Sequence, residues 1–220
     1  MIVSVIVPVF NEVENIAQVI RAVQAVPVDK EIIVVDDGST DGTRDVLTSI
    51  SGITTIFHRK NEGKGSAIRS GLKIATGEVI IIQDADLEYS PAQYPCLLEP
   101  IHLHKTRVVY GSRILGKGEF LVLSYLANRF LTLLTNLLYS ARITDMETCY
   151  KAVDARLFKE LGLVSSRFEI EPEITCKILR RNESIYEVPI SYHGRRKGKK
   201  IGPVDGLQAI WNLVKWKIRK

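Results

Sequence analysis

The sequence predicts a single α/β domain whose parallel sheet is flanked by helices. Short runs of Val and Ile alternate with amphipathic segments through the first half of the chain, an order typical of parallel strands joined by right-handed helical crossovers. The chain has 220 residues, 45% hydrophobic and 25% charged, which is enough to bury one substantial core. No internal repeat, linker or low-complexity segment divides the sequence, so one domain is expected over 1–220.

The elements of the first half follow from the spacing of their apolar residues. Residues 2–7 form a first strand that ends at Pro8, and a helix is predicted from about Glu12, with Asn11 as its cap. Further strands are expected at 31–35, 53–57 and 78–83, a short helix at 43–50, and a loop leading into a helix over 63–75. In such sheets, ligands bind in the loops at the carboxyl ends of the strands.

Residues 120–141 are long enough for a membrane span and contain a single charge, Arg129. Their periodicity instead predicts an amphipathic helix that packs on the domain or lies in an interface. One face is polar, with Asn128, Thr132, Thr135, Asn136 and Tyr139. The opposite face is apolar, with Leu126, Phe130, Leu133, Leu134 and Leu137.

The end of the chain is predicted to be amphipathic and basic, with a helix near 170–181, a strand near 184–192 and a final helix over about 204–220. Residues 195–220 hold nine Lys or Arg and one Asp, whereas the whole chain has a net charge of +5. This charge favours an anionic lipid surface or a phosphate ligand, and no nucleic-acid partner is expected. The final helix either lies on a membrane or packs on the core through an apolar stripe formed by Leu207, Ile210, Trp211, Val214 and Ile218.

Cysteine usage and the N-terminus indicate the compartment. Cys96, Cys149 and Cys176 are far apart in sequence, which favours a reducing compartment over a disulfide or zinc framework. The apolar residues 2–9 lack a basic lead and a small-residue cleavage site, so they are interpreted as a strand rather than a signal peptide. We therefore expect a cytoplasmic protein, peripheral at the inner face of the membrane.

The motif with the clearest chemistry is Asp84-Ala85-Asp86, which directly follows the apolar run 79–82 and Gln83. Two carboxylates one residue apart at the end of a buried strand repel each other unless a cation lies between them. Mg²⁺ is typically held by one or two carboxylates together with substrate phosphates. We therefore expect Asp84 and Asp86 to hold Mg²⁺ or Mn²⁺ beside a phosphorylated ligand.

The first two strands also end in polar segments, 8–12 and 36–43. Acidic groups at a strand's carboxyl end bind ribose hydroxyls or base N–H groups, although Asp and Gly also form ordinary capped turns. A calcium loop beginning at Asp37 is excluded because Thr48 stands where a bidentate Glu is needed. A dinucleotide fingerprint beginning at Gly63 is disfavoured because Ile68 replaces its third glycine.

Together, the segments 8–12, 36–43, 61–65 and 84–86 resemble the inverting glycosyltransferases of family 2 in order and spacing. The resemblance implies the GT-A fold, in which a Rossmann-like sheet binds a nucleotide sugar and a divalent metal bridges the donor's diphosphate. It implies a nucleotide-binding half over about 1–115 and an acceptor half over about 116–200. The donor-binding residues implied in this way are Pro8, Phe10, Glu12, Asp37, Lys64, Asp84, Ala85 and Asp86.

The second half is similar to the dolichyl-phosphate mannose synthases and related polyprenyl-phosphate sugar transferases, in the segments 111–113, 145–151 and 168–189. This branch implies transfer of a hexose, expected to be mannose from GDP-mannose, to a polyprenyl phosphate. The sequence departs from many members of the branch at Glu88, where they have Gln. The residues expected to act in the reaction are Asp86, Arg113 and Glu147.

A phosphate acceptor fits the basic residues of the chain. A phosphate monoester is mostly a dianion at pH 7, so it needs cations to hold it beside the anionic donor rather than a general base. The candidate cations are Arg113, Arg129, Arg195, Arg196, Lys199 and Lys200. A surface salt bridge for Arg113 and a solvated loop for the two lysines are the alternatives.

Two other functions are compatible with parts of the sequence. A soluble family 2 transferase would move sugar from a UDP- or dTDP-sugar to a glycan hydroxyl, and Asp145 or Glu147 would then be its general base. A non-catalytic basic module would bind a membrane or nucleic acid through its C-terminus. The second possibility leaves Asp84 and Asp86 without a role, so an enzyme is expected.

Overall fold

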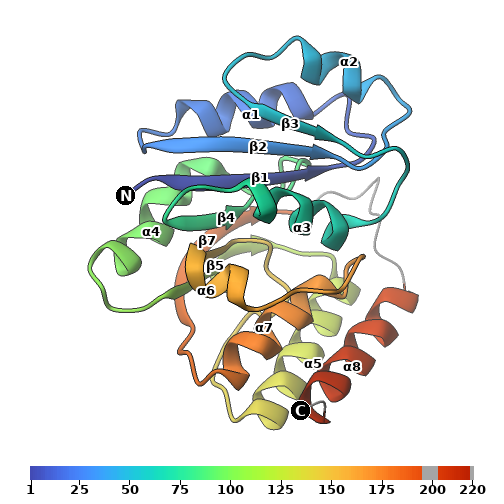
Figure 1. Ribbon diagram of the computed structural model, residues 1–220. Coiled ribbons are helices and arrows are strands. Elements are labelled where there is room, and N and C mark those ends of the chain that lie inside the picture. Colours follow the sequence, from blue (N-terminus) through green and yellow to red (C-terminus); the bar gives the residue numbers. More distant parts are fainter. Residues whose placement is uncertain (195–202, 219–220) are drawn as a thin grey trace.

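Seven strands form one sheet in the order β3-β2-β1-β4-β6-β5-β7 in a computed structural model that describes residues 1–194 and 203–218 (Figure 1). The strands are β1 (Val3–Val9), β2 (Lys30–Asp36), β3 (Thr54–Phe57), β4 (Val79–Ile82), β5 (Val108–Glu119), β6 (Lys151–Asp154) and β7 (Tyr186–His193). The helices are α1 (Ile16–Ala25), α2 (Thr43–Thr48), α3 (Lys64–Ile74), α4 (Tyr94–His102), α5 (Val122–Tyr139), α6 (Ala155–Glu160), α7 (Ile170–Arg180) and α8 (Pro203–Ile218), with a short 3-10 turn η1 (Pro91–Gln93) before α4.

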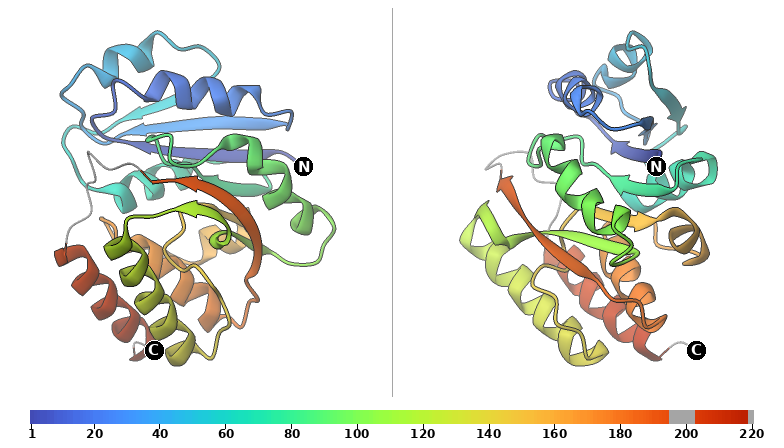
Figure 2. Two further views of the ribbon diagram at one scale, coloured as in Figure 1. Left: turned by 180° about the vertical axis from the view of Figure 1, so that it is seen from behind. Right: turned by 90° about the vertical axis from the view of Figure 1, so that its left-hand side faces the viewer.

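The first half of the sheet has the parallel arrangement that its Val/Ile runs predict. Every residue of β1 is buried, because β2 and β4 flank it and helices cover both faces. Figure 2 shows α1 and α4 on one face of the sheet and α3 and α6 on the other. Val9 of β1 is opposite Asp36 of β2, so the carboxyl ends of these strands meet at one edge of the sheet.

The expectation of parallel strands does not hold throughout. β6 runs antiparallel to both of its neighbours, β4 and β5, while β5 and β7 pair in parallel. β6 is only four residues long and follows an irregular segment, so no alternation with a helix marked it in the sequence.

The predicted cap of the first helix is wrong. The helix α1 begins at Ile16 rather than near Glu12, and Asn15 occupies the N-cap position. Asn11 has a positive φ of 50°, and its side-chain oxygen accepts a hydrogen bond from the backbone N–H of Thr40 at 2.9 Å. Asn11 therefore ties together the loops after β1 and β2 instead of capping a helix.

The predicted amphipathic helix over 120–141 is α5, and it packs with its polar face inward. Asn128, Thr132 and Thr135 are buried, whereas Leu133 and Leu137 are 57% and 72% exposed. Asn128 and Thr132 find partners inside the domain, so burying them costs little. The apolar face is thus left on the outside of the molecule.

The final helix, α8, lies beside α5 and α7 in the lower part of the molecule (Figure 1). It contributes Ala209, Leu213 and Trp216 to a second core that is separate from the core of the sheet. The predicted stripe is only half-buried at Ile210 and Val214 and is exposed at its other members, Leu207, Trp211 and Ile218. Within residues 1–194 and 203–218, no helix combines the length and hydropathy needed to cross a bilayer.

Candidate active site

The predicted donor residues meet at the carboxyl edge of β1, β2 and β4. Pro8 lies within β1 and is buried, while Phe10 follows the strand and is half-buried. Glu12 is buried, and its backbone N–H donates to Thr43 Oγ1 at 3.0 Å. The structure therefore holds the segment after β1 against the segment after β2.

Asp37 is fixed from three sides. It is 2% exposed and accepts hydrogen bonds from the backbone N–H groups of Glu62 and Gly63 at 3.0 and 2.7 Å. The His58 ring lies 2.8 Å from Asp37 Oδ1 through Nδ1 and 2.9 Å from Ser70 Oγ through Nε2. These bonds hold the segments 36–43 and 61–65, both predicted to bind the nucleotide, against each other.

His58 is a member of this site that sequence reasoning missed. It directly follows β3, just as Asp37 follows β2. The rule that ligands bind at the carboxyl ends of parallel strands therefore points to His58 as well.

The loop before α3 requires glycine. Gly63 has φ +97°, and a Cβ placed on it would lie 2.4 Å from the carbonyl oxygen of Ser166. A Cβ on Gly65 would lie 2.5 Å from the carbonyl oxygen of Ser165. The first turn of α3 is thereby pressed against the segment that precedes α7, which brings Lys64 under the Asp-x-Asp motif.

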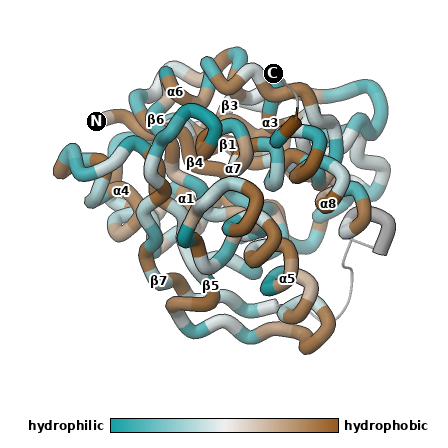
Figure 3. Tube along the Cα trace, turned by 90° about the horizontal axis from the view of Figure 1, so that it is seen from below, coloured by the Kyte–Doolittle hydropathy of each residue, from teal (hydrophilic) through white to brown (hydrophobic). Residues whose placement is uncertain are grey.

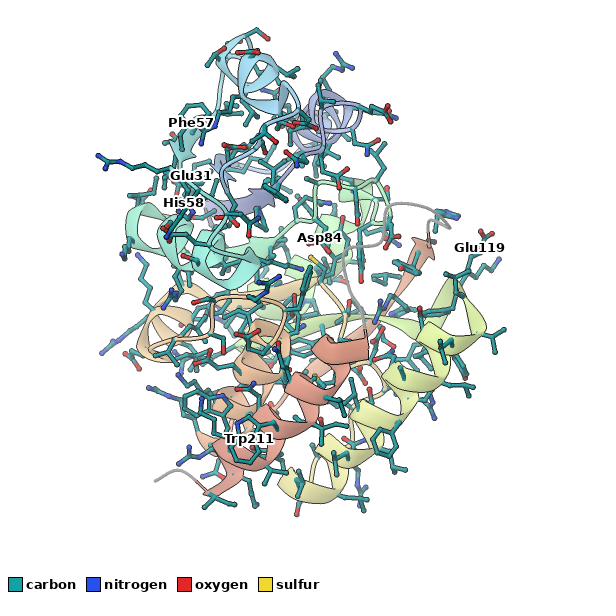
Figure 4. The ribbon with its side chains drawn as sticks, turned by 90° about the vertical axis from the view of Figure 1, so that its right-hand side faces the viewer. Glu31, Phe57, His58, Asp84, Glu119 and Trp211 are labelled. Atoms are coloured by element: carbon teal, nitrogen blue, oxygen red, sulfur yellow. The ribbon has the colours of Figure 1, made fainter. Side chains whose placement is uncertain are left out.

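Lys64 pairs with the first aspartate of the motif. Its Nζ lies 2.7 Å from Asp84 Oδ1 and 3.0 Å from an oxygen of Glu171 on α7. Burial alone would raise the pKa of Asp84, but the Lys64 ammonium outweighs burial and leaves that pKa below its usual value. The Lys64 cation thus stabilises the negative charge of Asp84, and Figure 4 shows Asp84 near the middle of the molecule.

Asp86 is the last residue of the motif, and a tight turn joins it to Glu88. Asp86 Oδ1 accepts a hydrogen bond from the backbone N–H of Glu88 at 3.2 Å. Leu87 between them has φ +61°, a strained backbone conformation that is found disproportionately at functional sites. Glu88 Oε2 accepts a hydrogen bond from the Tyr192 hydroxyl at 2.6 Å, which joins this turn to the end of β7.

The residues present fit a divalent metal that shares its ligands with a substrate. Asp84 and Asp86 are half-buried and supply two carboxylates. No group of three or more His, Cys, Asp or Glu side chains in the described ranges is arranged as a complete metal site. Two carboxylates completed by phosphate oxygens are the usual protein environment of Mg²⁺. The buried Ala85 separates the two carboxylates and brings no polar atom of its own side chain.

Arg113 is held rigidly rather than by a surface salt bridge. Its Nε and Nη2 donate to the two oxygens of Asp145, each at 2.7 Å, and its backbone N–H donates to the same carboxylate. Asn128 of α5 donates to Asp145 at 2.8 Å. The rings of Phe120 and Tyr192 lie 5.4 and 5.0 Å from the Arg113 Cζ. The alternative of an exposed ion pair for Arg113 is therefore wrong.

An aromatic cluster connects the motif to Arg113. The Tyr89 ring lies 4.8 Å from that of Tyr150 and 5.1 Å from that of Tyr192. The Tyr89 hydroxyl accepts from the backbone N–H of Cys149, whose thiol donates to the backbone carbonyl of Ile82 at 3.6 Å, two residues before Asp84. The candidate donor and acceptor residues are therefore joined through one packed set of side chains.

The remaining predicted cations are not brought to this cluster. Arg129 is exposed on the outer side of α5, one residue from the buried Asn128. Arg195, Arg196, Lys199 and Lys200 lie outside the described residues.

Glu147 is a half-buried carboxyl group close to several charges. Burial raises its pKa from 4.5 to about 7, and Glu171 adds to the rise while Lys151 and Arg113 oppose it. Its Oε1 has no hydrogen-bond partner within the part of the chain that the structure describes. Glu147 therefore gains and loses its proton near neutral pH.

We expect Glu147→Gln to change how stability depends on pH. Between pH 4.5 and about 7 the folded protein binds a proton that the unfolded chain lacks, so wild-type stability falls as the pH rises through this range. Glu147→Gln should abolish this fall and raise the melting temperature relative to wild type by on the order of 5 °C above pH 7. Thermal unfolding from pH 5 to pH 8 measures the melting temperatures of the wild type and of Glu147→Gln. Replacement of an exposed glutamate, Glu14→Gln, is the control. Parallel profiles for wild type and Glu147→Gln would contradict the assignment.

Comparisons with known proteins identify the family and the fold of the chain. The family model described as Glycosyl transferase family 2 matches residues 4–162. The chain is 29% identical to a dolichol-phosphate mannosyltransferase of Pyrococcus furiosus, over 98% of this chain and 64% of that protein. It is 28% identical to an undecaprenyl-phosphate mannosyltransferase of Micrococcus luteus, over 98% of this chain and 94% of that protein.

Among solved structures, the fold matches glucosyl-3-phosphoglycerate synthase from Mycobacterium tuberculosis in complex with Mn²⁺, uridine diphosphate and phosphoglyceric acid. The TM-score is 0.78 at 21% identity, over 98% of this chain and 78% of that one. The predicted GT-A fold is confirmed.

Proposed function

We propose, from the premise that this chain belongs to glycosyl transferase family 2, that it moves a hexose from a nucleotide sugar to a polyprenyl phosphate with inversion. We propose further that the hexose is mannose and the carrier GDP. The names of the mannosyltransferases of Pyrococcus furiosus and Micrococcus luteus support the acceptor and the sugar.

One observation supports the choice of acceptor: the two faces of α5 have different surroundings. The polar face packs inside the protein, and the apolar face is exposed. On the inner face, Asn128 contacts Asp145, the carboxylate that holds Arg113. On the outer face, one or two residues further along, Arg129 and Phe130 are exposed. A single helix thus joins the fixed guanidinium to an apolar outer surface, as an acceptor with a phosphate head and a hydrocarbon tail requires.

In the proposed reaction, an oxygen of the lipid phosphate attacks C1 of the sugar from the face opposite the nucleotide. The C1–O bond to the nucleoside diphosphate breaks, and its electron pair leaves with the diphosphate. No proton has to be removed from a phosphate dianion. A bound Mg²⁺ or Mn²⁺ would be held by Asp84 and Asp86 and would neutralise charge on the leaving diphosphate.

The side chains of this protein would hold the two anions. Lys64 lies against Asp84 at the diphosphate end of the site, and Arg113 would bind the acceptor phosphate. Nε and Nη2 of Arg113 are used by Asp145, but no hydrogen bond is made by Nη1 among the described residues. Burial next to Asp145 fixes the guanidinium before the ligand arrives, so little entropy is lost on binding.

The outer surface of α5 and α8 would lie on the membrane. Figure 3, a view of the chain from below, shows hydrophobic stretches along both helices. Figure 4 shows Trp211 of this surface near the lower end of the molecule, away from Asp84. Basic side chains at the end of α8, Lys215 and Lys217, would meet anionic headgroups. The exposed apolar residues of this surface are Val122, Leu123, Leu126, Phe130, Leu133, Leu137, Leu207, Trp211 and Ile218.

A second candidate rests on Glu147. A carboxyl group with a pKa of about 7 is suited to general base catalysis, so transfer to a sugar hydroxyl through Glu147 remains the competing function. Asp145, the other predicted base, is bound to Arg113 and its pKa is lowered by that contact despite burial, so it is a poor base.

The deciding experiment offers the enzyme GDP-mannose, UDP-glucose or a dTDP-sugar, each with either a short polyprenyl phosphate or a panel of free glycans. The expected result is transfer from GDP-mannose to the polyprenyl phosphate. Because a phosphate dianion has no proton to lose, this transfer should persist in Glu147→Gln, so of the three residues expected to act in the reaction only Asp86 and Arg113 have a role in it. Transfer to glycans alone, lost in Glu147→Gln, would establish the second candidate instead.

Replacing two residues of the outer surface should weaken membrane binding. Phe130→Ser with Leu133→Ser removes apolar area without touching the buried face of α5. We expect roughly ten- to a hundredfold weaker binding to phosphatidylglycerol-containing vesicles, measured by flotation, and further weakening in added salt. The matched control is Ile74→Ser with Leu103→Ser, exposed residues of other elements. Equal losses in both pairs would contradict the assignment of this surface.

A further inference from the structure

Two lysines and one glutamate form a buried charged set beneath the Asp-x-Asp motif. Glu171 is 4% exposed and Lys151 is fully buried. Lys151 Nζ donates to Glu171 Oε2 and to the backbone carbonyl of Thr148. Lys64 Nζ lies 3.0 Å from the other oxygen of Glu171, Oε1. One carboxylate therefore faces two ammonium groups.

The set extends to Asp84, because Lys64 Nζ is also 2.7 Å from Asp84 Oδ1. Its members come from four elements or their ends: Lys64 from α3, Asp84 from the end of β4, Lys151 from β6 and Glu171 from α7. The order of charges is Lys151, Glu171, Lys64, Asp84, with alternating sign and zero sum. Alternating ion pairs of this kind hold buried charges that would each be costly alone.

Glu171 restrains the position of Lys64 in this set. An ammonium on a four-carbon stem has many rotamers, and a single partner such as Asp84 does not select one of them. Glu171 supplies the second contact, and Lys151 in turn fixes Glu171. Without Glu171, the two ammonium groups would face each other with no anion between them.

We propose that Glu171 is a positioning residue, which keeps the Lys64 ammonium against Asp84 where the diphosphate of a nucleotide donor binds. This inference rests on the proposed function only for the identity of the ligand. Glu171 acts through Lys64 and touches no substrate itself. Through it, α7 of the second half of the chain sets the geometry of the donor site in the first half.

The first test removes Glu171 together with its buried partner. Glu171→Gln alone leaves Lys151 buried without a counter-ion and is expected to unfold readily. The double variant Glu171→Gln/Lys151→Met keeps the net charge and removes one of the two anionic contacts of Lys64. We expect it to remain folded by thermal unfolding and to bind GDP with Mn²⁺ roughly ten- to a hundredfold more weakly by calorimetry. Wild-type affinity in the folded double variant would overturn the proposal.

The second test is a double-mutant cycle between Lys64 and the Glu171–Lys151 pair, which is replaced as a unit so that Glu171 is never left buried without a cation. A residue that acts through Lys64 has no effect once Lys64 is absent. Glu171→Gln/Lys151→Met should therefore weaken GDP binding when Lys64 is present but not in Lys64→Met. A role in folding alone would weaken GDP binding equally in both backgrounds, which would overturn the proposal.

A buried pair on the same helix provides the control. Glu173 of α7 is fully buried, pairs with Lys177 at 2.6 Å and accepts from the backbone N–H groups of Val164 and Ser165. Glu173→Gln/Lys177→Met loosens the segment that packs on α3 without removing a charge next to Lys64. We expect little change in GDP affinity, and a loss as large as that of the Glu171 variant would overturn the proposal. Failure of the wild type to bind any nucleoside diphosphate would instead refute the proposed function.

Discussion

Asp86→Ala is expected to lower sugar transfer by on the order of a thousandfold or more while leaving the protein folded. The Asp86 carboxylate would hold the metal that neutralises the leaving diphosphate, and Asp84 is already engaged by Lys64. Asp86 has acidic neighbours, Asp84 and Glu88, so its removal relieves repulsion. The free energy of unfolding should therefore stay the same or rise slightly.

Transfer assays and calorimetry with GDP, each with Mn²⁺ and with EDTA, measure this effect. Wild-type binding of GDP should depend on the metal, and Asp86→Ala should lose that dependence. The control is Asp45→Ala, because Asp45 is an exposed acid in the first turn of α2, where it only complements the helix dipole. Unchanged turnover in Asp86→Ala, or full wild-type activity in EDTA, would show that Asp86 holds no catalytic metal.

Arg113→Ala is expected to destabilise the protein by about 3–5 kcal/mol, because it leaves the buried Asp145 carboxylate without its partner. Burial would otherwise raise the pKa of Asp145, and the Arg113 guanidinium holds it below its usual value. The stabilisation by this pair is therefore present at neutral pH and is lost only in acid, as the pH falls through the lowered pKa.

Arg113→Lys separates acceptor binding from folding. Lysine keeps the charge but lacks the planar fork that bonds both oxygens of Asp145. We expect a folded enzyme with near-normal GDP binding whose use of polyprenyl phosphate falls roughly ten- to a hundredfold. Denaturant unfolding and acceptor kinetics measure the two effects, with Arg107→Ala as an exposed ion-pair control worth at most about 1 kcal/mol. Unaltered acceptor kinetics in Arg113→Lys would show that Arg113 does not bind the acceptor phosphate.

The local pattern of apolar and polar residues was sufficient to predict most of the helices and strands. The Val/Ile runs predicted β1, β2 and β4 within one or two residues, since a buried parallel strand needs nothing more than a continuous apolar run. The edge strand β3 was predicted within one residue although it is only partly buried. The spacing of polar and apolar residues likewise predicted α5. The prediction of a helix cap at Asn11 was wrong because a polar residue after a strand can bind a neighbouring loop as readily as it can cap a helix.

The candidate site could be predicted only in part. Asp84, Asp86 and Lys64 stand in local motifs, and a strand's carboxyl end marks them. Lys151 and Glu171 lie in the segments 145–151 and 168–189 that resemble the polyprenyl-phosphate branch, but nothing in either segment pairs the two residues. A lysine within an apolar strand is itself a signal of a buried partner. His58 directly follows β3, so the strand-end rule applies to it, but it stands in none of the segments that predicted the site.

The sequence by itself determined the alternating strands and helices, the carboxylates at the end of β4 and the two faces of α5. These follow from periodicity, which is a property of neighbouring residues. Only the tertiary structure decided that the polar face of α5 turns inward, because the partner that satisfies Asn128 is Asp145, 17 residues away. It also decided that Lys64 and Lys151 share Glu171, since residues on α3, β6 and α7 meet only when the chain folds. Pairings between distant charges leave no periodic trace, because any carboxylate in the chain is an equally good partner until packing selects one.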